Sequence, residues 1–135
     1  CHGSRGAKED FFKDVGYAIQ FDSTENDTMS LSLMGTQLFE QDSEFFNKTK
    51  GLILEHGFTE WRHHPYTDTM VLKERFNFAC LNFAAGYYNY HTDNEYVIVE
   101  DVLNSTLLGE SVIKELGNEF YEFKVPKKGS FGWFD

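Results

Sequence analysis

The sequence predicts an α/β fold in which helices pack on a mixed β-sheet. Three observations support this class: short apolar runs that fit buried strands, longer segments with helical periodicity between them, and turn-forming residues at the junctions. With 135 residues, of which 41% are hydrophobic and 17% aromatic, the chain is long enough to form a domain with its own core. The composition therefore indicates a globular protein rather than a disordered segment.

The N-terminal part is predicted to form a short helix and two strands. Ser4 can cap a helix predicted over 7–13. The run 15–21 is mostly apolar and too short for a helix, so we expect a buried strand that ends at Asp22. After a polar turn, the alternation over 28–33 predicts a second strand, which we place at an edge of the sheet.

The middle of the chain alternates between helix and strand signals. An amphipathic helix is predicted over 43–56, with Gly57 in its C-terminal cap. The segment 59–66 fits either a strand or an irregular loop. A short helix is expected over 69–75, and the apolar run 76–84 predicts the next strand.

The C-terminal part is dominated by one long helix. Gly86 interrupts the preceding strand, and 87–95 is expected to be a polar, aromatic loop. Apolar residues at helical spacing predict a helix over 99–116, which Gly117 stops. The aromatic, glycine-containing tail 118–135 is expected either to dock on the domain or to extend from it.

Charge and cysteine content restrict the partners and the compartment. The formal net charge is -10, and an acidic surface repels phosphate backbones, so we expect no nucleic acid partner. No apolar window approaches a membrane-spanning length, so we expect no membrane partner either. Cys1 and Cys80 lack a CxxC spacing, and Cys80 lies in an apolar run that predicts a buried, inert thiol. A reducing, cytoplasmic location follows as an expectation.

Two potential metal ligands follow predicted buried strands. Asp22 closes the first strand, and His91 lies in the loop after the strand that ends near Ala84. Loops at strand ends commonly carry functional residues, and zinc binds carboxylate and imidazole groups. The alternative is an aspartate that caps a turn and a histidine that is merely exposed. His63 and His64 are interpreted as residues of an exposed loop, because adjacent histidines point to opposite sides of an extended chain.

A longer motif around His91 supports the interpretation of Asp22 and His91 as metal ligands. The stretch Gly-Tyr-Tyr-Asn-Tyr-His-Thr-Asp-Asn-Glu-Tyr-Val at 86–97 resembles the last metal-ligand loop of the co-catalytic zinc exopeptidases. That clan includes the zinc aminopeptidases, peptidase T and carboxypeptidase G. The apolar strand over 18–22 resembles the clan's strand that closes on an aspartate ligand. Residues 1–4 resemble the stretch after its paired glutamates, and 67–68 resembles its Thr-Asp loop. In order and approximate spacing, these matches cover nearly the whole chain.

The resemblance implies the C-terminal half of a three-layer, aminopeptidase-like catalytic domain. In that clan, two zinc ions share an activated water that attacks the N-terminal peptide bond of a peptide substrate. By the resemblance, Asp22 would ligate one zinc ion and His91 the other, and Glu95 would support the His91 loop. About 69 residues separate Asp22 from His91, which leaves no room for an inserted lid domain. Thr67, Asp68 and Tyr90 would form the substrate-side loops.

The sequence also departs from the clan. The general-base glutamate and the other metal ligands would lie upstream of Cys1, so the resemblance assigns no catalytic residue to this chain. Ser23 and Thr24 follow the aspartate where many relatives carry basic residues, and Tyr90 stands where a small residue or proline is usual. We therefore expect the chain alone to be inactive.

An incomplete sheet would expose strand edges, so we expect association with the missing N-terminal half or with copies of the same chain. The alternative is a peptidase-derived structural or interaction module that has lost catalysis, with Trp133 and Phe134 of the tail buried in an oligomer.

Overall fold

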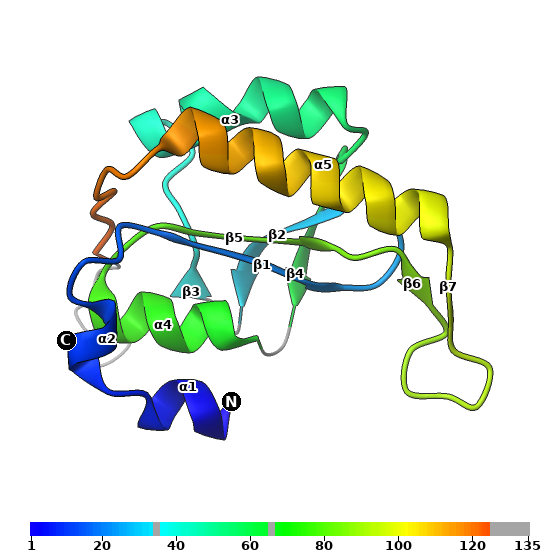
Figure 1. The fold of residues 1–135 in the computed structure, drawn as a ribbon, viewed down its shortest axis with the longest axis horizontal. Coiled ribbons are helices and arrows are strands. Elements are labelled where there is room, and N and C mark those ends of the chain that lie inside the picture. Colours follow the sequence, from blue (N-terminus) through cyan, green and yellow to red (C-terminus); the bar gives the residue numbers. More distant parts are fainter. Residues whose placement is uncertain (34–35, 65–66, 125–135) are drawn as a thin grey trace, which may run out of the picture.

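The computed structural model forms three layers, with a mixed sheet between two layers of helices (Figure 1). One face of the sheet is covered by α3 (Glu44–Glu55) and α5 (Val99–Leu116), and the other by α4 (Asp68–Phe76) together with α1 (His2–Gly6) and α2 (Glu9–Phe12). The α/β class, with helices on a mixed sheet, is therefore confirmed. The structure describes residues 1–33, 36–64 and 67–124.

The main sheet contains both parallel and antiparallel pairs. Its strands are β1 (Ala18–Ser23), β2 (Thr28–Leu33), β3 (Thr36–Gln37), β4 (Glu60–His64) and β5 (Cys80–Ala84). The order along the sheet is β1-β5-β2-β3, and β4 pairs with β2. The pairs β1–β5 and β2–β4 are parallel, whereas β2 runs antiparallel to β3 and β5. A separate ribbon of β6 (Tyr87–Tyr88) and β7 (Tyr96–Val97) extends beyond the end of β5.

The core is built around β5, in which all five residues are buried. The ring of Phe83 packs against Phe21 of β1, with ring centroids 5.5 Å apart, and against Phe58, at 5.4 Å. Full burial of each such side chain contributes about 1.5–3 kcal/mol to the free energy of folding. The complete burial of β5 therefore reflects a strand with both faces covered.

The predicted helix after residue 42 is confirmed as α3, and both of its ends have a local cause. The Ser43 hydroxyl accepts a hydrogen bond from the backbone N–H three residues later, as an N-cap does. At the other end Gly57 has a φ of +84°, and its N–H donates to the Leu54 carbonyl at 3.0 Å. The N–H of Phe58 donates to the Ile53 carbonyl at 3.1 Å, which completes a Schellman motif.

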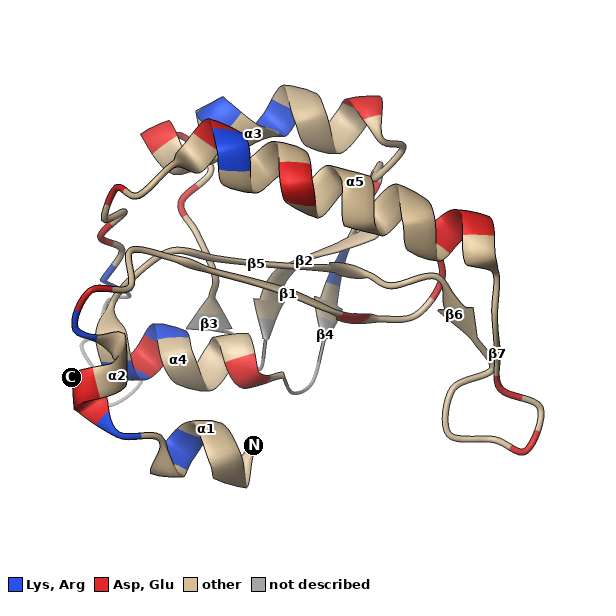
Figure 2. Cartoon of the chain, viewed as in Figure 1, with Lys and Arg blue, Asp and Glu red and all other residues tan. Residues whose placement is uncertain are grey.

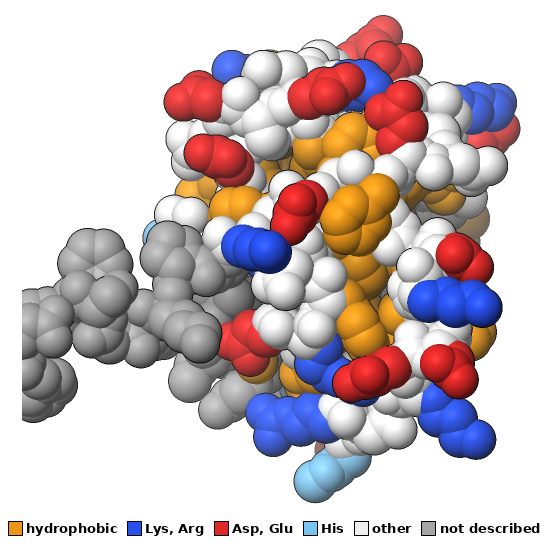
Figure 3. All heavy atoms as spheres, turned by 90° about the vertical axis from the view of Figure 1, so that its left-hand side faces the viewer, with side chains coloured by type: hydrophobic (Ala, Val, Ile, Leu, Met, Phe, Trp, Pro, Cys, Tyr) orange, Lys and Arg blue, Asp and Glu red, His pale blue; other side chains and the backbone are white. Residues whose placement is uncertain are grey.

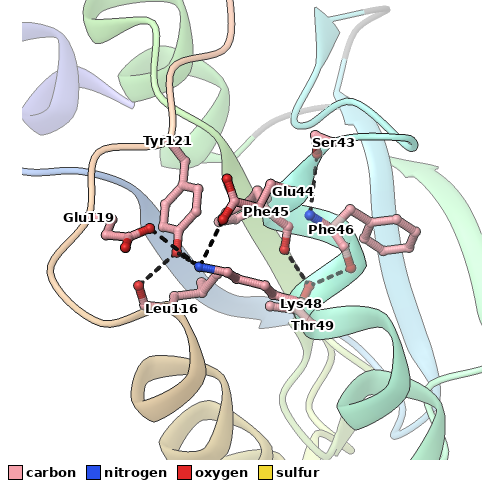
Figure 4. A network of polar contacts seen from close by, with 9 residues as sticks. All are labelled: Ser43, Glu44, Phe45, Phe46, Lys48, Thr49, Leu116, Glu119 and Tyr121. Carbon is pink, nitrogen blue, oxygen red and sulfur yellow. Dashed lines mark hydrogen bonds and ion pairs between the residues drawn. The ribbon is translucent and has the colours of Figure 1, made fainter.

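The segment that follows α5 is fastened to α3 by Lys48 (Figure 4). The Lys48 ammonium lies 3.2 Å from the Tyr121 hydroxyl, 3.1 Å from Glu44 and 3.3 Å from Glu119. The hydrogen bond with Tyr121, followed by that with Glu44, raises the pKa of Lys48. The Tyr121 hydroxyl in turn donates to the Leu116 carbonyl at 2.8 Å. The tail is therefore docked as far as residue 124, while 125–135, with Trp133 and Phe134, lies outside the described residues.

The expected edge position of β2 is wrong. This strand pairs with three others, β3, β4 and β5, and its polar side chains are buried rather than exposed to solvent. Ser30 and Ser32 are 0% and 7% exposed, because the first hydroxyl bonds to Asn82 and the second to His63. The alternation that predicted a half-exposed strand is thus an alternation between apolar and hydrogen-bonded buried positions.

Further element boundaries differ from the sequence predictions. The strand expected over 15–21 is Ala18–Ser23, and the loop expected over 87–95 begins with the strand Tyr87–Tyr88, which pairs with β7. The helix expected over 7–13 is shortened to α2, since Ala7 is extended with ψ 139°, and Ser4, its expected N-cap, lies inside the separate helix α1. The strand expected from residue 76 begins at Cys80, because α4 continues to Phe76 and Asn77 then adopts a left-handed conformation with φ 55°. The ambiguous segment 59–66 contains a strand, β4, and its last two residues lie outside the described residues.

The surface combines apolar and charged side chains. Figure 3 shows the side of the molecule that carries α2 and the segment after α5, where apolar side chains gather between charged ones. Phe11 and Phe120 are among the exposed apolar residues, with 76% and 58% of their surface accessible to solvent. Among the residues that the structure describes, no helix has both the length and the apolar character needed to cross a lipid bilayer.

The two thiols are expected to differ sharply in reactivity. Cys1 is exposed, whereas Cys80 is buried in β5, and this burial raises its pKa to about 12. Because the thiolate is the reactive species, a disulfide reagent such as DTNB should modify one thiol rapidly in the native chain and two in denaturant. Rapid modification of both thiols in the native chain would contradict the packing of β5.

Candidate functional site

Asp22 lies at a β-bulge near the end of β1. Phe21 pairs with Phe83 of β5 and Ser23 pairs with the next residue, Ala84, so Asp22 is the extra residue of β1. Its side chain is exposed, whereas Ser23 is buried. A bulge turns a side chain away from the regular alternation of a strand, and it often does so beside functional sites. The bulge therefore presents the Asp22 carboxylate to solvent at the end of a strand that is otherwise packed.

A buried asparagine holds this bulge. Asn82 of β5 is 0% exposed, and its side-chain oxygen accepts a hydrogen bond from the Asp22 N–H at 3.3 Å. Its amide nitrogen donates to the hydroxyls of Ser23 at 3.1 Å and Ser30 at 3.0 Å. One side chain thus connects β1, β5 and β2 at the position of the bulge. The sequence analysis did not identify Asn82, although a polar residue within the apolar run 76–84 was a usable signal.

Backbone hydrogen bonds continue the pairing of the two strands beyond their ends. Ala85 donates to the Ser23 carbonyl, Gly86 donates to the Glu25 carbonyl, and Glu25 donates to the Tyr87 carbonyl, each at 2.8 Å. Gly86 adopts a φ of +83°, which redirects the chain into β6. The segment after β1 and the start of the β6–β7 ribbon are therefore fixed relative to one another.

His91 lies in the tight turn between β6 and β7. It has a φ of +59°, and Asn89 has one of +54°, so two residues other than glycine are left-handed here. The Glu95 carboxylate accepts a hydrogen bond from the His91 backbone N–H at 2.9 Å, and the Thr92 hydroxyl donates to the Asn89 carbonyl at 2.5 Å. The exposed His91 imidazole packs edge-on against the Tyr90 ring, with centroids 5.0 Å apart. Glu95 thus holds the backbone of the turn rather than the imidazole.

Tyr87 connects the Asp22 bulge to this turn. Its hydroxyl donates to the Asp22 backbone carbonyl at 3.2 Å. Burial raises the pKa of Tyr87, and the negative charges of Asp22 and Glu95 raise it further, with a smaller contribution from Tyr90. Asp22, Glu95 and Tyr90 are therefore all close enough to one phenol to affect its titration. The structure thus places the start of the β6–β7 ribbon, through the Tyr87 hydroxyl, against the Asp22 bulge.

The start of α4 lies on the same side of the domain as the end of β1. The Thr69 N–H donates to the Gln20 side-chain oxygen at 3.2 Å, which ties α4 to β1 two residues before Asp22. Asp68, an expected substrate-side residue, is exposed and accepts a hydrogen bond from the Ser4 hydroxyl of α1 at 2.6 Å. Thr67 is only 5% exposed and its hydroxyl lies 2.6 Å from that of Thr69, so its position makes it a structural residue of this turn.

All four segments that resemble the zinc exopeptidases are thus linked. The N-terminal segment contacts the start of α4, α4 contacts β1, and β1 contacts the β6–β7 ribbon. Figure 1 shows that β1 and β5 both run toward the side on which this ribbon lies. Ligand-bearing loops gather at the carboxyl ends of parallel strands in the same way in other α/β proteins.

His63 does not belong to this group. It lies on β4, and its Nδ1 is 2.5 Å from the Ser32 hydroxyl of the neighbouring strand β2. Its side chain is exposed, as the sequence analysis expected, but it is carried by a strand rather than by a loop. The side chain of His64 lies outside the described residues.

The electrostatic character of the site favours cations. Between Tyr87 and Asp101 the chain carries Asp93, Glu95, Glu100 and Asp101 but no lysine or arginine. Figure 2 shows these acidic positions on the ribbon and on the first turn of α5. The Tyr88 hydroxyl donates to Asp101 at 2.6 Å, and this hydrogen bond raises the pKa of Tyr88 to about 12. A positively charged ligand would meet a negative potential on this side.

The residues fit part of a metal site. A carboxylate and an imidazole are ordinary zinc ligands, and both are exposed here on backbone held by hydrogen bonds. Within 1–33, 36–64 and 67–124, however, no three His, Cys, Asp or Glu side chains are arranged so that they could share a metal ion. Any metal bound at Asp22 or His91 would therefore need further donors from outside these residues.

Comparisons with known proteins leave the family open. No protein-family model, curated protein or solved structure gives a significant match to this chain. Function has to be inferred from the residues and their geometry.

Proposed function

We propose that this chain is part of the catalytic domain of a two-zinc, aminopeptidase-like exopeptidase, in which Asp22 and His91 each ligate one of the two zinc ions. The observation that carries the proposal is the junction at Tyr87. Two segments far apart in sequence, each resembling a ligand segment of that clan, meet there through a hydrogen bond from the Tyr87 hydroxyl to the Asp22 carbonyl. The parallel pairing of β1 and β5 brings the two segments to the same end of the sheet, as the proposal requires.

The local backbone of both residues supports a ligand role. Asp22 is turned outward by the bulge, and His91 occupies a left-handed conformation that costs about 1 kcal/mol for a residue other than glycine. Glu95 and Asn82 each accept a hydrogen bond that holds one of these two backbones in place. Such support for exposed side chains is typical of sites where geometry matters for binding.

When bound, two zinc ions would supply an activated water and stabilise the oxyanion of a peptide bond under attack. The residues of this chain would hold the metals and orient the peptide. The acidic surface of the ribbon would attract the protonated amino terminus of the substrate. Tyr90 packs against the proposed ligand His91, and the exposed side chains of Tyr90 and Asp68 would contact the substrate.

The general base and the remaining ligands must come from other residues. Because the described residues contain no set of three donors, this chain is not expected to hydrolyse peptides alone. Zinc binding is therefore the property to test first, since it depends on fewer groups than turnover does.

The test is isothermal titration of the chain with Zn²⁺ at neutral pH. We expect weak binding that Asp22→Asn and His91→Gln each reduce at least about tenfold, which corresponds to about 1.4 kcal/mol. The matched controls are Asp93→Asn, an exposed carboxylate of the same ribbon, and His63→Gln, an exposed histidine on β4. Equal losses in the ligand and control variants would overturn the assignment of Asp22 and His91.

A non-catalytic interaction module is the second candidate. The observation that favours it is the lack of a three-donor metal group among the residues that the structure describes. This candidate predicts a stable assembly that contains no zinc and that does not change when zinc is added or removed. Dissociation or inactivation of such an assembly by a chelator would argue against it.

A further inference from the structure

One edge of the sheet is open in the described part of the chain. All pairing of β1 there is with β5. Ala18 donates its N–H to the Ala79 carbonyl on the β5 side, at 3.2 Å. Since alternate residues of a strand bond to opposite sides, the backbone groups of Ile19 and Phe21 face the open edge. An edge with unpaired N–H and C=O groups is a template for another strand.

The helix above this edge packs directly over the pair β1–β5. A Cβ atom at Gly109 of α5 would lie 3.1 Å from the Phe21 ring of β1. The Ser105 hydroxyl of α5 donates to the Ala84 carbonyl of β5 at 2.9 Å. The lateral position of α5 is therefore fixed between the outermost two strands of the sheet.

The outer face of α5 carries exposed apolar residues together with an ion pair between Glu110 and Lys114, at 2.7 Å. Its buried residues are Ser105, Leu108, Gly109, Val112 and Leu116. Its exposed apolar residues are Val99 at 76%, Val102 at 38%, Leu103 at 56%, Leu107 at 46% and Ile113 at 55%. At 100° per residue these five fall within one stripe beside the buried face, which we name the α5 stripe. A soluble helix ordinarily carries polar residues at such positions.

We propose that β1 and the α5 stripe form a twofold interface with a second copy of this chain. In this arrangement β1 pairs antiparallel with β1 of the second copy, and the two sheets become one continuous sheet. The two α5 helices then lie antiparallel on the same face and cover each other's stripe. A twofold contact uses the same patch on both copies, so a patch of this kind must be complementary to itself.

The spacing of the elements permits this contact. Because α5 lies between β1 and β5, the two helix axes would be separated by two strand spacings, roughly 10 Å. Helices pack at interaxial distances of about 8–10 Å. The two α5 helices would therefore be in contact when the two β1 strands are hydrogen-bonded. An α5 of 18 residues is about 27 Å long. A contact of that length through a helix layer and a strand layer approaches the roughly 800 Å² per partner of a stable interface.

Charge complementarity also favours the antiparallel arrangement. α5 carries Glu100 and Asp101 in its first turn and Lys114 in its last turn. Antiparallel packing centred near Leu107 brings the last turn of one helix, where Lys114 is also paired with Glu110 at 2.7 Å, near the acidic first turn of the other. It also aligns the two helix dipoles favourably. The net charge of -10 on each copy opposes association, so the dimer should be stronger at higher salt.

The experiment is sedimentation equilibrium of the full chain between about 1 and 100 μM, at low and high NaCl. We expect a monomer–dimer equilibrium that shifts toward dimer as salt increases. Ile113→Lys should weaken dimerisation at least tenfold, because each substitution is present on both sides of a twofold interface. Ile19→Pro, which removes an N–H from the open edge, should have a similar effect. The matched control is Leu54→Lys on α3, which adds the same charge at a side chain 46% exposed.

Each outcome decides for or against the proposal. Circular dichroism of the two interface variants must first show native helix content, and the lysine variant serves if the proline variant does not fold. A chain that stays monomeric over the whole range overturns the proposal. So does a dimer that responds equally to Ile113→Lys and Leu54→Lys, or an open series of larger oligomers. Co-purification of a different polypeptide that the interface variants release would give the surface another occupant and would also overturn it.

Discussion

Replacing Gly86 with alanine is expected to lower the free energy of unfolding by about 3 kcal/mol or more. Gly86 has a φ of +83°, a conformation that costs residues with a Cβ atom about 1–2 kcal/mol. A Cβ atom there would also lie 2.7 Å from the Val102 nitrogen and 2.9 Å from the Asp101 carbonyl carbon. These are backbone atoms in the first turn of α5, so the ribbon and the helix would have to move apart.

Gly57→Ala separates these two contributions. Gly57 has nearly the same φ, +84°, but a Cβ atom there would have no neighbour within 4 Å. Its substitution should therefore cost only the conformational strain, about 1–2 kcal/mol. Urea denaturation of both variants, followed by far-UV circular dichroism, gives the comparison. Equal destabilisation would mean that the ribbon is not held tightly against α5, and the position proposed for His91 would lose its support.

Replacing Asn82 with leucine is expected to destabilise the chain by about 2–4 kcal/mol, because it removes three hydrogen bonds that each contribute about 0.5–1.5 kcal/mol. Asn82 is fully buried and bonds to the Asp22 N–H, the Ser23 hydroxyl and the Ser30 hydroxyl. The two hydroxyls would be left facing an apolar side chain. The bulge at Asp22 would also lose the hydrogen bond that fixes its N–H.

The matched control for Asn82→Leu is Asn47→Leu. Asn47 is exposed on α3, and its side-chain amide donates a long hydrogen bond to the Asp42 carbonyl, at 3.5 Å. Its substitution should change the free energy of unfolding by less than about 0.5 kcal/mol, as surface substitutions usually do. Hydrogen exchange supplies a second measurement, in which Asn82→Leu should increase exchange across 18–23 more than across α3. Unchanged exchange at the bulge would show that Asn82 does not position Asp22.

Elements with a strong local signal could be predicted from the sequence. α5 was predicted with its observed bounds, Val99–Leu116, because apolar spacing, length and Gly117 all indicate the same helix. β2 was also predicted at its observed residues, Thr28–Leu33, from alternation alone. Its place inside the sheet could not be predicted, because alternation does not distinguish solvent-facing serines from buried serines bonded to Asn82 and His63.

In the candidate site, too, some features could be predicted from the sequence and others could not. The resemblance implied that Glu95 supports the loop around His91, and in the structure the Glu95 carboxylate accepts a hydrogen bond from the His91 backbone N–H. The bulge at Asp22 carries no sequence signature, since it arises from a register shift between β1 and β5. The role of Tyr87 likewise depends on contacts between segments far apart in the sequence. Both the bulge and the Tyr87 contact depend on how distant segments pair in the fold, and this pairing cannot be predicted from a single sequence.

The most direct test of the proposed two-zinc function is native mass spectrometry of the protein as purified. One spectrum gives the mass of this chain, any partner chain and any bound metal. The proposal predicts an assembly that contains two zinc ions together with another polypeptide that supplies the remaining ligands, and that loses zinc when Asp22→Asn or His91→Gln is introduced. A chain that appears alone or as a homo-oligomer without zinc, even after incubation with Zn²⁺, would contradict the catalytic proposal.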